Sequence, residues 1–91
     1  MKTCRVFISG FVQGVGFRRF VRSKAEMLGL TGWVRNLPDR RVEVIAQGAK
    51  EKIEQLIKEC KKGSFLSEVE DLDVQWEEIE EKFDTFDISK A

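Results

Sequence analysis

The first hydrophobic run of the chain, from Thr3 to Val12, is predicted to form a central β-strand. Apolar side chains fall on both of its parities: Val6, Ile8 and Val12 on one, Phe7 and Phe11 on the other. Successive side chains of a strand point to opposite faces of the sheet, so this strand is partly apolar on both faces. That pattern is typical of a strand inside a sheet rather than at its edge.

Two later segments have the three- and four-residue spacing of helices. In and just before residues 18–30, the apolar positions are Phe17, Phe20, Val21, Ala25, Met27 and Leu28. This stripe predicts an amphipathic helix over residues 18–30, with its last turn weakened by Gly29 and with Gly32 just beyond it as the stop. From Ala49 to Lys62, the apolar positions are Ile53, Leu56, Ile57 and Cys60. They predict a second helix, ended by Gly63.

Four shorter runs are predicted to be strands. Trp33 to Leu37 and Arg41 to Gln47 follow the first helix, although Ile45 interrupts the alternation of the second run. Alternation of apolar and polar residues returns in residues 71–76 and again in residues 85–88. Runs of this length and period are typical of strands.

The predicted order is strand, helix, strand, strand, helix, strand, with a further short strand at the end. Each helix has one apolar stripe, so both can cover one face of a single sheet. This order predicts an α+β fold, the ferredoxin-like α/β sandwich (βαββαβ), with an antiparallel sheet and two helices on one face. The 91 residues suffice for one domain and not for two, so residues 1–91 are expected to form a single domain.

Composition narrows the class of protein. Hydrophobic residues make up 42% and charged residues 35% of the chain, a balance typical of a folded globular domain. No stretch approaches the about 20 apolar residues of a membrane helix, and no signal pattern opens the sequence, so a cytoplasmic protein without a membrane partner is expected. Cys4 and Cys60 form no Cys-x-x-Cys motif and are expected to be small buried hydrophobic residues.

The net charge is zero but unevenly distributed. Residues 1–41 contain nine Lys or Arg against Glu26 and Asp39, a net charge of +7, and residues 42–91 carry −7. An anionic ligand is expected to meet the first half, unless the pattern is only solvated surface charge. The absence of histidine excludes Ser-His-Asp and Cys-His nucleophiles, phosphohistidine intermediates and histidine metal sites.

The segment Gly10-Phe11-Val12-Gln13-Gly14-Val15-Gly16-Phe17-Arg18 leads from the first strand through a glycine-rich loop into a helix. Such a loop directs backbone N–H groups at one point beside the positive end of the helix dipole, which favours an anion. Arg18 and Arg19 add guanidinium groups whose fork matches two phosphate oxygens. The alternative is a strand-to-helix turn without a ligand. P-loop and dinucleotide motifs fail, because no Lys-Ser or Lys-Thr follows Gly16 and Arg19 stands at the third glycine position.

This segment resembles the first signature of the acylphosphatase family. Gly32-Trp33-Val34-Arg35-Asn36, with Val42 and Gly48 beyond it, resembles the second signature. Both fall at the expected places in a chain of the expected length, so the resemblance covers essentially the whole chain. Two spaced signatures are more specific than either glycine pair alone, and the family's ferredoxin-like sandwich agrees with the predicted order.

The resemblance implies an acylphosphatase that hydrolyses the carboxyl–phosphate anhydride bond of small acyl phosphates to a carboxylate and inorganic phosphate. It implies no metal, no cofactor and no phosphoenzyme. Arg18 would hold the phosphate, and Asn36 would position the attacking water. The phosphate-binding residues that the resemblance implies are Gln13, Gly14, Val15, Gly16, Phe17 and Arg18. Inorganic phosphate would be both product and inhibitor.

The chemistry of this reaction suits the residues present. Phosphoryl transfer depends mainly on positioning and on stabilisation of charge. The carboxylate leaves without a proton at neutral pH, so no general acid is required. The carboxamide of Asn36 takes up no proton near neutral pH, but it can orient a water molecule by hydrogen bonds. Without the resemblance, Asn36 before Leu37-Pro38 is more typical of a turn residue.

Arg40 departs from the second signature, which has glycine at this place. If the position requires a positive φ, arginine costs about 1 kcal/mol of backbone strain there. Alternatively, Pro38-Asp39 forms a different hairpin turn, in which glycine is unnecessary.

Two other functions stay open at this point. One is a module specialised for carbamoyl phosphate, like the domain that opens the large hydrogenase-maturation proteins. The other is a non-catalytic ferredoxin-like binding module, for RNA or for a regulatory ligand. An RNA-binding sheet exposes aromatic residues beside basic ones, for which only Phe7 and Phe11 are candidates. The acidic second half disfavours a polyanion, so no nucleic-acid partner is expected, and the protein is expected to be a monomer.

Overall fold

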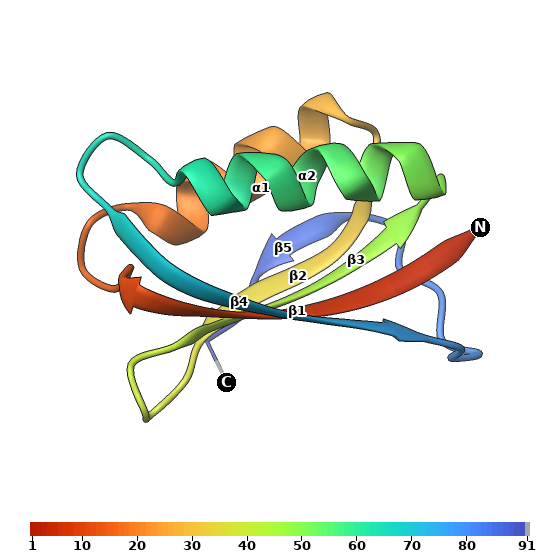
Figure 1. Ribbon diagram of the computed structural model, residues 1–91. Helices are drawn as coiled ribbons and strands as arrows, with labels where there is room; N and C mark the ends of the chain where they lie inside the picture. Colours follow the sequence, from red (N-terminus) through yellow and green to blue (C-terminus); the bar gives the residue numbers. More distant parts are fainter. Residues whose placement is uncertain (91) are drawn as a thin grey trace.

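A five-stranded β-sheet carries two α-helices on one of its faces (Figure 1). The computed structural model describes residues 1–90. The elements are β1 Lys2–Phe11, α1 Phe17–Met27, β2 Thr31–Asn36, β3 Val42–Gly48, α2 Lys50–Lys62, β4 Glu68–Glu77 and β5 Phe86–Ile88. The predicted ferredoxin-like α+β fold is confirmed. In the described residues, neither helix is long and apolar enough to cross a membrane.

The strand order of the sheet is β4-β1-β3-β2-β5. The pairs formed by β1, β2, β3 and β4 are antiparallel, as predicted, but β5 pairs with β2 in parallel, so the sheet is mixed. The reason lies in the connection of residues 78–85. β4 ends beside Thr3, at the end of the sheet where β2 begins, so the chain enters β5 there and must run in the direction of β2.

Gln47 of β3 fastens this connection to the sheet. Its buried side-chain amide donates from Nε2 to the carbonyl oxygen of Glu81 at 2.7 Å and to the hydroxyl of Thr3 at 3.1 Å. Its Oε1 accepts from the backbone N–H of Phe83 at 3.2 Å. These hydrogen bonds satisfy the buried amide. They also fix the path of the segment that leads into the edge strand β5.

The core lies between the sheet and the helices. The helices bury Phe17, Val21 and Ala25 from α1, and Ile53, Leu56 and Cys60 from α2. The strands that face them bury Val6, Ile8, Val34, Val44 and Ala46. The helical stripes therefore predicted the buried faces correctly, apart from Met27, which is 77% exposed because it lies in the last turn of α1, off the buried stripe. Cys4 and Cys60 are buried free thiols, as predicted, and burial raises the pKa of Cys60 to about 12.

Helix α1 ends earlier than predicted. Gly29 adopts φ 71°, and the N–H of Leu30 donates back to the carbonyl of Ala25 at 2.9 Å. A glycine in the left-handed region just past the last turn is a common helix stop. Gly29 therefore ends the helix, not Gly32. Gly32 lies inside β2, where a Cβ would clash with the carbonyl oxygen of Ile45.

The sheet face without helices holds an ionic cluster around Glu43 of β3. Glu43 is only 3% exposed. Its carboxylate accepts from Nε of Arg35 on β2 at 2.7 Å and from Arg5 on β1. Arg5 also donates to Glu77 of β4 at 2.8 Å. A buried carboxylate needs such partners, and here they join four adjacent strands. Ile45, which interrupts the alternation of β3, is buried on this same face.

Candidate active site

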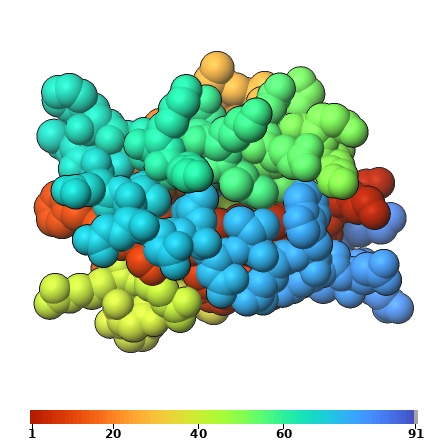
Figure 2. Space-filling view, in the orientation of Figure 1, coloured from red at the N-terminus to blue at the C-terminus, as the bar shows by residue number. Residues whose placement is uncertain are grey.

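One end of the sheet brings together the segments that the sequence singled out. Asn36 at the end of β2 and Ile8 of β1 both pair with Val42 at the start of β3. The glycine-rich loop of residues 12–16, called the glycine loop below, and the β2–β3 hairpin of residues 37–41 therefore leave the sheet at the same end. Figure 2 shows the hairpin, in yellow-green, projecting at the end of the molecule where the orange-red segment emerges.

The glycine loop has an alternating backbone conformation. Gly14 and Gly16 have φ of 76° and 75°, whereas Gln13 and Val15 have no positive φ. Alternation of this kind turns successive N–H groups toward a common point. A Cβ at either glycine would meet nothing within 4 Å, so the backbone conformation and not crowding requires glycine. Because α1 begins at Phe17, the positive end of its dipole adjoins the loop.

The backbone N–H groups of this region are unused. From residue 13 to residue 19, none donates a hydrogen bond to an acceptor among the described residues. The first amide of α1 with a partner is that of Phe20, which donates to the carbonyl of Gly16 at 3.1 Å. Any helix leaves its first N–H groups without partners, and here the loop adds further donors beside them. The arrangement is suited to binding the oxygens of an anion.

Arg18 lies in the first turn of α1 and is half-buried. It borders a hollow of about 300 Å³ whose lining includes Gly14, Gly16, Phe17, Arg19 and Lys90. Within residues 1–90, neither Arg18 nor Arg19 has an ion pair or a side-chain hydrogen bond. Unused amide donors and three cations therefore meet at one hollow, which is the electrostatic setting that a phosphate group requires.

The side chain of Gln13 joins the glycine loop to the hairpin. Its Nε2 donates to the backbone oxygens of Leu37 and Arg41, each at 2.9 Å. The hairpin is itself closed by the N–H of Leu37, which donates to the carbonyl of Arg41 at 2.8 Å. Leu37 directly follows Asn36, so this contact fixes where Asn36 lies relative to the loop.

Asn36 carries a buried polar atom without a partner. Its Oδ1 is inaccessible, and no donor in the described part of the chain reaches it. Buried side-chain oxygens are nearly always hydrogen-bonded, so this one requires an explanation. Left without a donor, this buried oxygen lowers the stability of the folded protein. Asn36 stands beside the glycine loop through the contact of Gln13, but it is not part of the lining of the 300 Å³ hollow.

Arg40 has a left-handed backbone with φ 76°, the only positive φ of a non-glycine residue among residues 1–90. Its N–H donates to the carbonyl of Leu37 at 3.1 Å, which makes a turn followed by a left-handed residue, a common three-residue hairpin. Pro38 has therefore not removed the need for glycine. Arginine occupies glycine's conformation, at a cost of about 1 kcal/mol.

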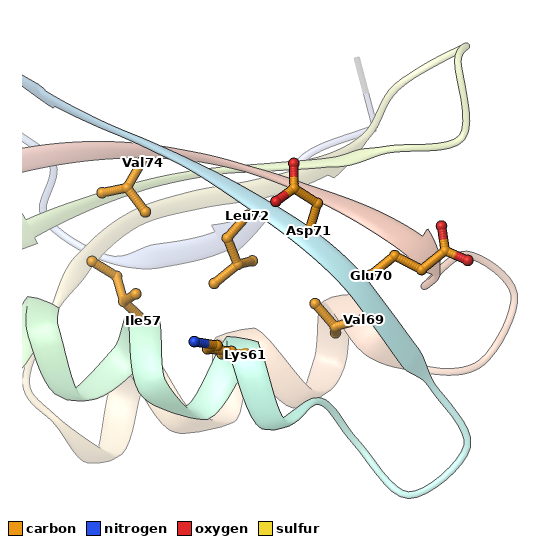
Figure 3. A pocket seen from close by; sticks show the side chains of 7 residues that line it. All are labelled: Ile57, Lys61, Val69, Glu70, Asp71, Leu72 and Val74. Atoms are coloured by element: carbon orange, nitrogen blue, oxygen red, sulfur yellow. The ribbon is translucent and has the colours of Figure 1, made fainter.

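A larger hollow, of about 420 Å³, lies between α2 and β4. Figure 3 shows Ile57 and Leu72 turned toward it, whereas the carboxylates of Glu70 and Asp71 point away. None of its lining residues belongs to the glycine loop or to the hairpin. It therefore lacks the converging donors that mark the smaller hollow, in spite of its size.

A family model described as Acylphosphatase matches residues 4–88. The chain belongs to the acylphosphatase family. An acylphosphatase from Acaryochloris marina is 49% identical over 84 residues, which cover 92% of this chain and 89% of that protein. The crystal structure of acylphosphatase from Bacillus subtilis has a TM-score of 0.94 at 38% identity, covering 98% of this chain and 99% of the other.

A similar fold occurs inside a larger protein. The crystal structure of HypF from T. kodakarensis matches 100% of this chain with 12% of its own, at 30% identity and a TM-score of 0.88. With acylphosphatases matching along nearly the whole chain, the protein is an enzyme that hydrolyses acyl phosphates. The interpretation as an acylphosphatase is confirmed, and the non-catalytic binding module is set aside.

Sequence reasoning missed two features of this end of the molecule. It assigned Gln13 to the loop through its backbone only, whereas the side chain joins the loop to the hairpin. It also left out Lys90, which lines the hollow beside Arg18. No local pattern signals either role, because both depend on pairing between segments far apart in the sequence.

Loss of the Gln13 side chain is expected to remove the contact that holds the hairpin against the glycine loop, and so to lower activity. Gln13→Ala should lower kcat about tenfold with a smaller change in KM, because a misplacement of about 1 Å can cost more than that. The free energy of unfolding should fall by about 1–2 kcal/mol, since two hydrogen bonds are lost. Steady-state kinetics and urea unfolding measure both, with Gln55→Ala on the exposed side of α2 as the control. Wild-type kcat in Gln13→Ala would contradict the positioning role.

Proposed function

We propose that the amides of residues 13–17 and the guanidinium of Arg18 bind the phosphoryl group of a small acyl phosphate, and that Asn36 places the attacking water. The observation that carries the proposal is the convergence of unused amides and an arginine without a partner at one hollow. The position of Asn36 supports the second role, because the hydrogen bond from Gln13 to Leu37 holds the end of β2 next to the glycine loop.

In this mechanism the water oxygen attacks phosphorus in line with the bridging oxygen of the anhydride. A new P–O bond forms as the bond to the acyl oxygen breaks, and the electron pair leaves on the carboxylate. The protons of the water go to the phosphate product or to solvent. Arg18 and the amides neutralise the charge that spreads over the phosphoryl oxygens, which is the main contribution that a protein makes to this transfer.

We further propose that inorganic phosphate, the product, inhibits by occupying the same amides and Arg18. The enzyme would act as a cytoplasmic monomer without nucleic-acid or membrane partners. The acidic second half of the chain supports the absence of a polyanion partner. The carbamoyl-phosphate alternative is tested in the same assay, by comparing carbamoyl phosphate with benzoyl phosphate as substrates.

Hydrolysis of benzoyl phosphate is expected to proceed at the same rate with and without a chelator such as EDTA. The proposed groups are amides, an arginine and an asparagine, none of which needs a metal to bind or orient the substrate. The measurement is the initial rate after exhaustive dialysis against the chelator. An enzyme that the chelator silences, and that magnesium or zinc restores, would show that the proposed mechanism is wrong.

A further inference from the structure

A second hollow adjoins the glycine loop. It measures about 280 Å³ and is lined by Gly10, Phe11, Val12, Gln13 and Arg40. Val12 also lines the hollow that holds Arg18, so the two hollows adjoin at the start of the loop. An acyl phosphate is longer than its phosphoryl group, so part of the substrate must extend beyond the phosphate position. The second hollow is an adjacent space that can receive it.

The charges near the hairpin single out Arg40. Other arginines of the sheet region have anionic partners: Arg5 and Arg35 pair with Glu43, and Arg41 pairs with Asp39 at 2.7 Å. The guanidinium of Arg40 forms no ion pair and no hydrogen bond within residues 1–90, and the residue is exposed. It is also held next to the loop, because the bonds of Gln13 reach the residues on both sides of the turn.

Neither the backbone conformation nor a polar contact accounts for arginine at this place. Its backbone has φ 76°, which glycine adopts without strain, and its side chain makes no hydrogen bond, ion pair or ring contact within the described residues. Phe11, which lines the same hollow, is 60% exposed. The hollow thus offers an apolar ring for the carbon body of an acyl group and a cation for an anionic group at its far end.

We propose that Arg40 is a specificity residue that selects acyl phosphates whose acyl group carries a second anionic group, with Phe11 contacting the carbon body. This inference rests on the proposed function, since it requires the phosphoryl group to occupy the glycine loop. A cation that meets the distal charge favours such substrates in kcat/KM, and salt weakens the effect because the pair is exposed.

Two matched aromatic substrates test the proposal: benzoyl phosphate and 4-carboxybenzoyl phosphate, which differ in one distal carboxylate. The quantity measured is the ratio of their kcat/KM values at low and at high ionic strength. At low salt, the ratio of the wild-type enzyme should exceed that of Arg40→Gln about threefold to tenfold. Arg40→Lys should keep most of the preference, and high salt should bring wild type and Arg40→Gln together.

The controls keep the outcomes separate. Arg22→Gln removes an arginine that pairs with Glu26 on α1 at 3.7 Å, and it should keep the wild-type ratio. Thermal unfolding followed by circular dichroism checks that each variant is folded, and the ratio within one variant cancels differences in active concentration. Equal ratios in wild type and Arg40→Gln at low salt would overturn the role of Arg40. Failure of the wild-type enzyme to hydrolyse benzoyl phosphate would instead overturn the proposed function.

Discussion

Arg18→Ala is expected to lose nearly all activity while it stays folded. The guanidinium would bind two phosphoryl oxygens by charge-assisted hydrogen bonds, and its loss should cost about 3 kcal/mol or more in transition-state binding, a factor above a hundred in kcat/KM. Inhibition by inorganic phosphate should weaken as well, because the same contact is made to the product. Arg18 has no partner within residues 1–90, and alanine is the best helix former, so stability should change little.

The measurement is steady-state kinetics with benzoyl phosphate, with phosphate as competitive inhibitor and circular dichroism to check folding. Arg18→Lys separates charge from geometry: it keeps one positive charge but not the two-pronged guanidinium, and should recover only part of the activity. Arg22→Ala, one turn further along α1, is the matched control and should remain active. Activity of Arg18→Ala within tenfold of wild type would remove Arg18 from the phosphate site.

Asn36→Ala is expected to lower kcat about a hundredfold or more, while KM and the inhibition constant of phosphate move only a few-fold. A residue that places water acts on the reaction and little on ground-state binding, in contrast to Arg18. The structure adds a second expectation. Removing a buried oxygen that has no protein partner should leave the free energy of unfolding unchanged or raise it, because the folded state then avoids the cost of desolvating that oxygen.

The two expectations for Asn36 are measured on one protein, by kinetics and by urea unfolding. A structural turn residue would behave in the opposite way, with lower stability and nearly normal kcat. A folded Asn36→Ala enzyme that keeps its kcat but binds phosphate poorly would assign Asn36 to the phosphate instead of the water.

The fold was largely predictable because the local patterns agree with the tertiary structure. Apart from the exposed Met27, the apolar stripes of both helices are the faces that pack on the sheet. β1 is an inner strand, as its two-sided apolar pattern indicated. The direction of β5 was not predictable from its own residues. It follows from the path of the connection formed by residues 78–85. The side chain of Gln47 holds this connection by hydrogen bonds to its backbone atoms, which leave no signal in the sequence.

The candidate site was predictable to the extent that it is continuous in the sequence. Gly14, Gly16 and Arg18 follow one another across the start of a helix, so their convergence is a local property. The relation of Asn36 to the loop is not local, because it depends on the pairing of β1 and β2 with β3 and on the contact of Gln13. For Arg40, sequence reasoning left two backbone conformations open, and the φ of 76° decides between them.

The direction of β5 has a practical consequence for tagging the enzyme. β1 begins beside Gly48, at the end of the sheet remote from the glycine loop, whereas β5 runs toward that loop and brings Lys90 to the hollow beside Arg18 (Figure 1). A purification tag or fluorescent reporter fused ahead of Lys2 would leave the molecule far from the proposed phosphate site. The same fusion placed beyond Lys90 would lie next to the hollow, and if the phosphoryl group binds there as proposed, the fusion would obstruct entry of the acyl phosphate and release of the product.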